Sequence, residues 1–274
     1  MSAVEAALFN GNEADSVPLA ARGLHYGDGV FRTCLIVDGR VLDWEGQIAR
    51  LSADAARLKL DPTPVTVAEE AGRLAAGQKR AVLKMLLMRA GEGRGYRPAG
   101  GKVDRLLLRY AAPRHPADCW DQGVAAFLAS TRLARQPALA GVKHLNRIEQ
   151  VLASAEWGEN CEEGILSDMH GKLVSGTRSN LFWTAGGRLQ TPSLRHAGVA
   201  GRMRERVLQL AIAQGLPCEE VEAGAEALER AEEIFLTNSL IGLWPVRRIG
   251  TRELMAPGPV CRQLSARLAH PRLD

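Results

Sequence analysis

The sequence predicts an α+β protein made of two α/β lobes joined by a short linker. Two observations support this prediction. Apolar runs typical of strands recur along the chain, and segments with helical spacing of apolar residues lie between them. A length of 274 residues allows two modest domains, each with its own core. Hydrophobic residues make up 46% and charged residues 24%, which is the composition of a globular protein.

The first expected lobe covers residues 1–113. It contains the strand-like run VFRTCLIV, which a turn at Asp38-Gly39 joins to a second short apolar run. Segment 45–60 has apolar residues three and four positions apart and predicts an amphipathic helix, and a second helix is expected over 66–77. The runs AVLKMLLMRA and DRLLLRYAA then predict two strands around a glycine-rich loop.

Residues 114–122 are the expected linker, because this stretch is polar, contains proline and lacks periodicity. The second lobe, 123–274, is expected to begin with the strand VAAFLAS, and the helix IEQVLASAEWGEN is expected to follow. Alternating strands and glycine turns follow, as in a sheet meander. The segment GVAGRMRERVLQLAIAQG predicts a loop that leads into a helix, and a last helix is expected near 258–270.

Composition argues against several classes of function. The net charge of +4 comes from scattered arginines, so a nucleic-acid partner is not expected. The five cysteines lie far apart without a histidine at ligand spacing. This pattern predicts neither a metal site nor disulfides, and it favours a reducing, cytoplasmic location. No apolar run reaches the length of a membrane span, so no membrane partner is expected either.

Lys143, within the stretch AGVKHLNRIEQ, is the first candidate for chemistry. A lysine amine can bond to an aldehyde cofactor when its orientation is fixed and its proton affinity is lowered. The glycines of GVAG precede a helix and can present N–H groups to a phosphate, and Ser239 in LTNSL offers a hydroxyl. Arg50 can add a forked positive charge. Taken singly, such residues are more often surface or capping groups than ligands.

In their order along the chain, several motifs resemble those of the fold-type IV pyridoxal-phosphate enzymes. This family contains branched-chain aminotransferases, D-amino-acid aminotransferases and aminodeoxychorismate lyases. The resemblance spans roughly residues 18–250 and is carried by RGLHYGDGVFRT, IARL, GRGY, KHLNRIEQ, GTRSNLFW, GVAGRMR and LTNSLIGLWPV. Of these, GRGY, KHLNRIEQ and NSLIGLWPV are more similar to the lyase branch than to the aminotransferases.

The resemblance implies a role for each candidate residue. Lys143 matches the lysine that carries pyridoxal 5′-phosphate (PLP) and moves protons, and Thr33 matches a threonine associated with catalysis. The other cofactor-binding residues implied are Arg50, Ser175, Asn180, Val199, Ala200 and Ser239. The substrate-binding residues expected are His25, Phe31, Arg94 and Tyr96. A homodimer is implied by the resemblance alone.

At Ser175 the sequence departs from the family pattern. Members usually carry a glutamate there, five residues before the asparagine of N-L-F, where it pairs with the protonated pyridine nitrogen of the cofactor. A serine hydroxyl can hydrogen-bond this nitrogen but cannot stabilise a positive charge as a carboxylate does. The change should harm an aminotransferase more than a lyase, because the lyase reaction is also driven by formation of an aromatic ring.

The resemblance therefore predicts a PLP-dependent lyase of folate biosynthesis that converts 4-amino-4-deoxychorismate, a small molecule, to 4-aminobenzoate and pyruvate. Three alternatives stay open: an aminotransferase for D- or branched-chain amino acids, a non-catalytic PLP-binding protein, and a nucleic-acid-binding module. Asp28 is expected to hold the glycine turn of YGDG, and the pair Glu162-Glu163 is expected on a solvated face.

Overall fold

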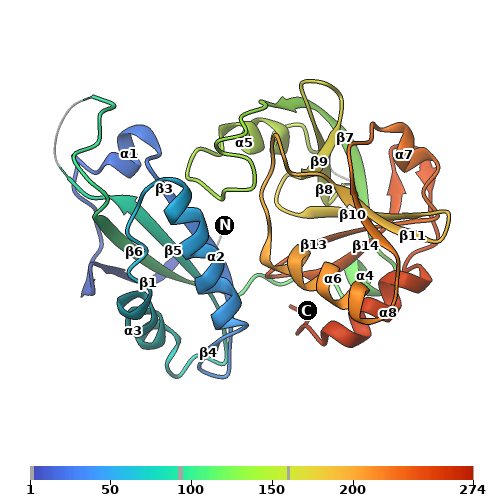
Figure 1. The fold of residues 1–274 in the computed structure, drawn as a ribbon. Helices are drawn as coiled ribbons and strands as arrows, with labels where there is room; N and C mark the ends of the chain where they lie inside the picture. Colours follow the sequence, from blue (N-terminus) through green and yellow to red (C-terminus); the bar gives the residue numbers. More distant parts are fainter. Residues whose placement is uncertain (1–2, 92–94, 159–160, 274) are drawn as a thin grey trace. The chain divides into compact units, whose positions relative to one another are not determined.

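The computed structural model describes residues 3–91, 95–158 and 161–273. The chain divides into two compact units. Unit 1 is Met1–Pro113 together with Val142–Asn146, and unit 2 is Arg114–Gly141 together with Arg147–Asp274. Each unit has its own sheet and its own hydrophobic core (Figure 1).

The division expected from the sequence differs from this one in two respects. Residues 114–122 belong to unit 2 and contain helix α4 (Asp118–Asp121), whose buried Trp120 donates its indole N–H to Ile241 O at 2.9 Å. Residues 142–146, which include Lys143, belong to unit 1 and not to the C-terminal lobe. The reason is that this segment pairs with a strand of unit 1.

Unit 1 is an antiparallel sheet with two longer helices on one face. The strand order is β2-β1-β6-β5-β3-β4. The strands are β1 (Val4–Phe9), β2 (Asn12–Glu13), β3 (Gly29–Val37), β4 (Arg40–Val41), β5 (Arg80–Arg89) and β6 (Val103–Ala111). The helices are α1 (Arg22–Tyr26), α2 (Trp44–Arg57) and α3 (Pro64–Ala75). Helices α2 and α3 and strands β3, β5 and β6 confirm the sequence prediction, whereas β1 and β2 were not predicted.

Helix α2 forms because its apolar residues recur on one face, where Ile48, Leu51 and Ala55 are buried. The strand residues in the same core are Val30, Cys34, Ile36, Leu83, Met85, Leu87 and Leu107. Along β3 and β5 these are alternate positions. Because successive strand residues point to opposite faces, Phe31, Thr33 and Lys84 lie on the sheet face opposite α2 and α3.

The segment Val142–Asn146 pairs antiparallel with the first half of β3. Phe31 N–H donates to Lys143 O at 2.9 Å. Leu145 N–H donates to Gly29 O at 3.0 Å. The first residue of the segment is fully buried in the core of unit 1. The segment thus extends the edge of the unit 1 sheet. Its pairing with β3 fixes Lys143 in unit 1, although the rest of unit 1 is distant from it in sequence.

Unit 2 is built on a mixed sheet with the strand order β12-β11-β10-β13-β14-β7-β8-β9 and with β15 beside β14. The strands are β7 (Val124–Leu133), β8 (Glu163–Asp168), β9 (Leu173–Gly176), β10 (Asn180–Ala185), β11 (Arg188–Pro192), β12 (Cys218–Val221), β13 (Glu233–Asn238), β14 (Gly242–Ile249) and β15 (Arg252–Glu253). The remaining helices are α5 (Ile148–Ser154), α6 (Arg202–Ala213), α7 (Glu226–Glu229) and α8 (Pro259–Leu268). Strand β9, at one end of the order, also lies against β10 and β11, so the sheet curls on itself (Figure 1).

The main core of unit 2 lies between the sheet and helices α6 and α8. The rings of Phe182 and Phe235 stack with centroids 5.2 Å apart, and Val207 of α6 and Leu264 of α8 are buried in the same cluster. Both helices confirm the sequence prediction. Helix α5 ends at Ser154, well before the end of the segment that predicted it.

Candidate active site

Lys143 lies against the sheet face of unit 1 that is opposite α2 and α3. Its ammonium group is 4.5 Å from the centre of the Phe31 ring, which is within the range of a cation–π interaction. Thr33 lies two residues further along β3 and therefore on the same face as Phe31. Unit 1 by itself brings together the predicted lysine, the predicted threonine and one of the predicted substrate residues.

A second lysine on this face was missed by the sequence analysis. Lys84 of β5 is the cross-strand partner of Thr33, and its ammonium lies 5.2 Å from the centre of the Phe31 ring. Burial lowers the pKa of the Lys84 ammonium. A lysine in the middle of the apolar run AVLKMLLM was the available signal, since a strand interior seldom contains an isolated charge without a role.

The backbone of Lys143 is fixed from two sides. Its carbonyl accepts the Phe31 N–H, and its own N–H donates to Asp54 Oδ2 at 3.1 Å. Asp54, on α2, also forms an ion pair with Arg32 of β3, and both side chains are buried. Neither residue of this pair was singled out from the sequence.

Arg50 lies on α2 one turn before Asp54, so the two side chains leave the helix on the same face. Burial lowers the pKa of the Arg32 guanidinium, and the nearby positive charge of Arg50 adds to this effect while Asp54 opposes it. The predicted phosphate ligand therefore lies close to the ion pair that contacts the Lys143 backbone.

In unit 2, Asn180 joins three of the candidate stretches. It is the first residue of β10 and pairs with Thr237 of β13. Its Nδ2 donates to Val199 O at 2.8 Å, in the loop before α6. A Cβ atom on Gly201 would lie 2.2 Å from Asn180 Oδ1, so this approach requires a glycine.

The loop before α6 leads to the N-terminus of a twelve-residue helix, where unpaired N–H groups favour an anion. Of the two predicted amides, that of Ala200 donates to Gly141 O at 2.9 Å. The Val199 N–H has no hydrogen-bond acceptor among the described residues. The Val199 amide is therefore the better placed of the two to bind a ligand.

Ser175 lies in a strand that packs against this loop, and Ser239 lies in a separate turn of unit 2. Ser175, on β9, is buried and donates its hydroxyl to Gly176 O at 2.8 Å. The neighbouring Val174 packs so closely on the loop that a Cβ on Gly198 would lie 2.6 Å from its Cγ1. Ser239 lies in the turn between β13 and β14, and His270 Nε2 is 3.1 Å from its carbonyl oxygen.

The predicted substrate residues are only partly brought together. Phe31 contacts Lys143, as described. His25 and Tyr96 are exposed and pack around Tyr26, with ring centroids 6.0 Å and 5.5 Å from it. The fourth, Arg94, lies outside the described residues.

The acidic residues follow the sequence prediction at one place and not at another. Asp28 holds its turn as expected, through ion pairs with Arg22 at 2.9 Å and Arg89 at 3.0 Å. The prediction for the pair Glu162-Glu163 was wrong for its second residue. Glu163 is 2% exposed, and its carboxylate accepts hydrogen bonds from the hydroxyls of the loop that precedes Asn180. A buried carboxylate is retained there because each oxygen has a donor.

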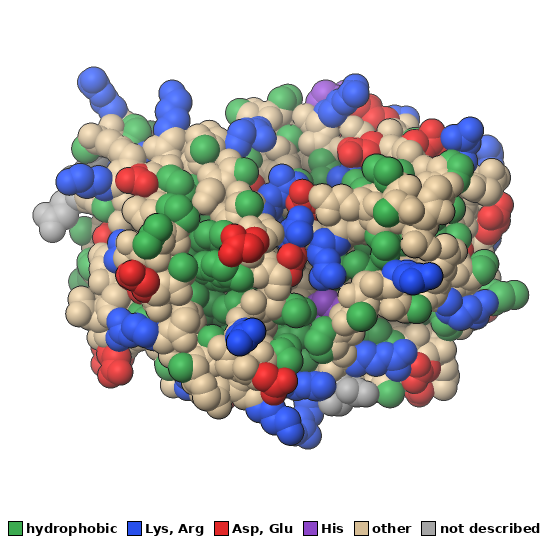
Figure 2. Space-filling view, turned by 60° about the horizontal axis from the view of Figure 1, so that its bottom comes forward, with side chains coloured by type: hydrophobic (Ala, Val, Ile, Leu, Met, Phe, Trp, Pro, Cys, Tyr) green, Lys and Arg blue, Asp and Glu red, His purple; other side chains and the backbone are tan. Residues whose placement is uncertain are grey.

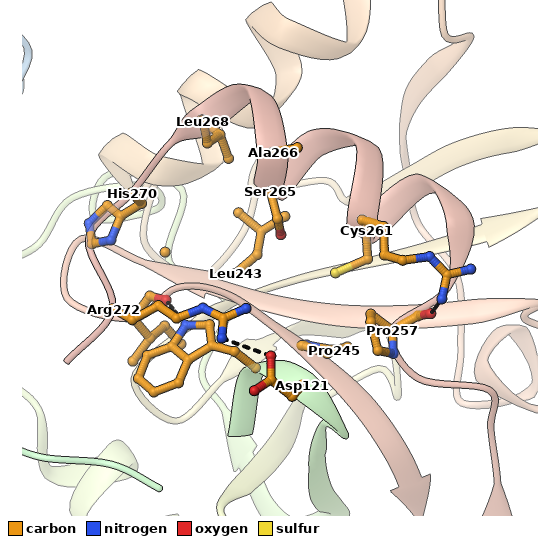
Figure 3. Close-up of a pocket in the computed structure, with 14 residues that line it drawn as sticks. Asp121, Leu243, Pro245, Pro257, Cys261, Ser265, Ala266, Leu268, His270 and Arg272 are labelled. Atoms are coloured by element: carbon orange, nitrogen blue, oxygen red, sulfur yellow. Dashed lines mark hydrogen bonds and ion pairs between the residues drawn. The ribbon is translucent and has the colours of Figure 1, made fainter. Parts of the chain in front are cut away.

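A pocket of about 400 Å³ lies in unit 2 between α4, β14 and α8 (Figure 3). The ion pair between Arg272 and Asp121, 2.7 Å long, lies at its border. None of the predicted site residues is among those that line it. His270, which lines the pocket, approaches the carbonyl of Ser239.

Within residues 3–91, 95–158 and 161–273, no cluster of His, Cys, Asp and Glu side chains is arranged to hold a metal ion. In the same ranges, no helix is long and apolar enough to cross a bilayer. On the face shown in Figure 2, Lys and Arg side chains are interspersed with Asp and Glu side chains.

The sequence model of the family described as amino-transferase class IV matches residues 29–249. The chain therefore belongs to the amino-transferase class IV family. Its two units, each built from a sheet and helices, have the fold of that family.

Among individual relatives, the chain is 33% identical to an aminodeoxychorismate lyase of Vibrio harveyi over 254 residues, which cover 92% of this chain and 94% of the relative. The crystal structure of 4-amino-4-deoxychorismate lyase from Pseudomonas aeruginosa is similar with a TM-score of 0.91 and 38% identity, covering 96% of this chain and 97% of that chain. A putative branched-chain-amino-acid aminotransferase of Methanocaldococcus jannaschii is 30% identical over 240 residues, covering 85% and 82%.

Proposed function

We propose that this protein is a PLP-dependent aminodeoxychorismate lyase, which converts 4-amino-4-deoxychorismate to 4-aminobenzoate and pyruvate in folate biosynthesis. The observation that carries the proposal is the setting of Lys143, whose backbone is bonded on both sides and whose amine lies on the Phe31 ring. Similarity to two lyases over more than nine-tenths of the chain supports the lyase rather than the aminotransferase.

The donor set of the site suits PLP. The aldehyde of the cofactor needs an amine, which Lys143 supplies. Its phosphate needs N–H donors and positive charge, which the Val199 amide, the start of α6 and Arg50 supply. The loop around Val199 is closely packed, because Cβ atoms on Gly198 and Gly201 would clash with Val174 and Asn180, and this packing fixes the backbone that carries the Val199 amide. When bound, PLP supplies an electron sink for the reaction.

Chain connectivity links Lys143 to the proposed phosphate-binding loop. Gly141 N–H donates to Gly198 O at 3.0 Å, so Gly141 is held by the loop before α6. Lys143 follows two residues later, and two residues of chain span at most about 7 Å. The lysine and the proposed phosphate-binding loop are therefore tethered to each other by the backbone itself.

Two residues of this chain would move protons. We assign to the Lys143 amine the removal of the proton from the substrate ring carbon that bears nitrogen. Thr33 lies on the same sheet face, and its hydroxyl would orient that amine or protonate the departing enolpyruvate. Expulsion of enolpyruvate leaves an aromatic product, which supplies part of the driving force.

We also propose that the protein is a homodimer. Helix α5 exposes Ile148, Val151 and Leu152 by 65%, 59% and 55%. Residues three and four positions apart share one face of a helix, so these side chains form an exposed apolar surface of the kind that mediates association. Light scattering of the purified protein should give twice the monomer mass, and a monomer at micromolar concentration would contradict the proposal.

The decisive experiment is an assay of 4-aminobenzoate release from aminodeoxychorismate by the PLP-loaded protein, with Lys143→Ala as the blank. We expect Lys143→Ala to abolish turnover and the absorbance of bound cofactor together, whereas Lys79→Ala, which removes an exposed lysine, should change neither. Borohydride reduction followed by peptide mass mapping should place PLP on Lys143. A Lys143→Ala variant with normal activity would disprove the assignment, and bound cofactor without product would favour another amine substrate or a non-catalytic protein.

A further inference from the structure

The pairing between Phe31 and Lys143 departs from a regular antiparallel ladder. In such a ladder, opposed pairs that exchange two backbone hydrogen bonds alternate with pairs that exchange none, and Phe31 and Lys143 occupy a hydrogen-bonded position beside the Val30–His144 bridge. Here Phe31 N–H donates to Lys143 O at 2.9 Å. The second donor, the Lys143 N–H, donates to Asp54 Oδ2 at 3.1 Å. A carboxylate on α2 thus takes the place of a backbone acceptor at the residue that carries the amine.

This carboxylate is itself held in place. Asp54 Oδ2 also accepts from Arg32, and the side chains of the pair are 5% and 3% exposed. Arg32 lies between Phe31 and Thr33 in β3 but points to the opposite, core-facing side of the sheet. A carboxylate buried without a partner would be strongly disfavoured, so the Arg32 guanidinium compensates its burial and fixes its orientation.

We propose that Asp54, oriented by Arg32, is a positioning residue that fixes the backbone of Lys143 and thereby the direction in which its amine projects. This inference rests on the proposed role of Lys143. Asp54 touches the lysine backbone and not the reacting atoms, so its effect on catalysis is transmitted through the lysine. Misplacement of a reacting group by about 1 Å costs on the order of 100-fold in rate.

Unit 1 contains a second ion pair that serves as a control. Glu70 of α3 and Arg105 of β6 lie 2.8 Å apart, with side chains 4% and 16% exposed. This pair joins a helix to the same sheet, as Asp54 and Arg32 do, but it lies on different elements from the lysine-bearing segment. If Asp54 acted on stability alone, substitution of either carboxylate should have the same consequences for Lys143.

The first test uses the full chain without cofactor. Hydrogen exchange of the Lys143 amide should be about tenfold faster or more in Asp54→Leu than in the wild type, since its acceptor is lost. Asp54→Asn retains an acceptor oxygen and should restore part of the protection. Glu70→Gln should leave this amide unchanged. Wild-type protection of the Lys143 amide in a folded Asp54→Leu variant would overturn the proposal.

The second test uses the PLP-loaded protein. In Asp54→Leu we expect the visible circular dichroism per bound cofactor to fall at least twofold and kcat to fall about 10- to 100-fold, with KM within about threefold of wild type. Glu70→Gln should keep wild-type values of all three. If Asp54→Leu does not fold, Arg32→Met/Asp54→Leu removes both charges together and should show the same losses, because a buried pair replaced by apolar residues is often tolerated.

Different results would refute the proposed lyase function and the proposed positioning role of Asp54. Absence of PLP on Lys143 in the wild type would refute the proposed function while leaving the exchange result to decide the role of Asp54. Normal cofactor dichroism and normal kcat in a folded Asp54 variant would refute the positioning role while leaving the lyase intact.

Discussion

Lys84 and Lys143 place their ammonium groups 5.2 Å and 4.5 Å from the centre of the same aromatic ring, that of Phe31. The two lysines come from different parts of the sequence, one from the middle of β5 and the other from the segment paired with β3. These two positive charges lie at one ring, and one of them is partly desolvated. Both features lower the free energy of unfolding, which is a common cost of a functional site.

Lys84→Met should raise the melting temperature at pH 7, because it removes a half-buried positive charge. Burial lowers the folded-state pKa of Lys84 below its ordinary value of 10.5. Its cost to stability is therefore fully present below the folded pKa and disappears as pH rises through the folded pKa toward 10.5. Thermal unfolding as a function of pH should show the variant and wild type converging in alkali. Lys79→Met, at an exposed position just before β5, is the control, and an equal effect there would contradict the explanation.

Gly201→Ala should weaken cofactor binding and destabilise the fold. The added Cβ would meet Asn180 Oδ1 at 2.2 Å. The Asn180 side chain would have to move, which would disrupt the hydrogen bond from its Nδ2 to Val199 O. We expect a loss of roughly 1–3 kcal/mol in unfolding free energy, as for other overpacked sites. Denaturant unfolding and PLP titration measure the two effects.

The matched control for this substitution is Gly72→Ala. Gly72 lies in helix α3, and a Cβ there would meet no atom within 4 Å. It should stabilise the protein by up to about 1 kcal/mol, because alanine favours the helix. Equal behaviour of the two alanine variants would show that the start of α6 is not tightly packed.

Arg50→Met should weaken the binding of PLP by about tenfold or more, which corresponds to about 1.4 kcal/mol. The guanidinium would be lost as a phosphate ligand, while the amine of Lys143 would remain. Turnover at saturating PLP should therefore largely recover. Arg57→Met, at an exposed position on the same helix, should bind PLP as the wild type does. Unchanged affinity in the Arg50 variant would remove this residue from the site.

Ser175→Glu tests the position at which the chain departs from its family. The Ser175 hydroxyl donates to Gly176 O, so it can offer a ring nitrogen only its lone pairs, which stabilise a positive charge less than a carboxylate does. The glutamate variant should release product faster or transaminate amino acids as a side reaction. Ser175→Ala is the companion variant. If neither rate changes, the ring nitrogen does not limit this enzyme.

Much of the fold could be predicted because its elements are specified locally. Helix α2 was predicted from Ile48, Leu51 and Ala55, whose spacing matches a helical turn. Strand β1 was not predicted, because its short run contains Glu5 and becomes a strand by pairing with β6. Helix α5 was predicted too long, since the apolar pattern continues beyond the last residue that the fold keeps helical.

The sequence by itself determined the family, and it predicted the lysine and most of the proposed ligands, because these depend on residue types in a recognisable order. It could not reveal that Lys143 belongs with unit 1, or that Asp54 contacts its backbone and Lys84 shares the Phe31 ring with it, because those contacts join residues 53 to 112 positions apart in sequence. Strand pairing and helix packing brought these residues together. The tertiary structure decided which charges accompany the lysine, since burial and proximity arise only when distant segments share a core.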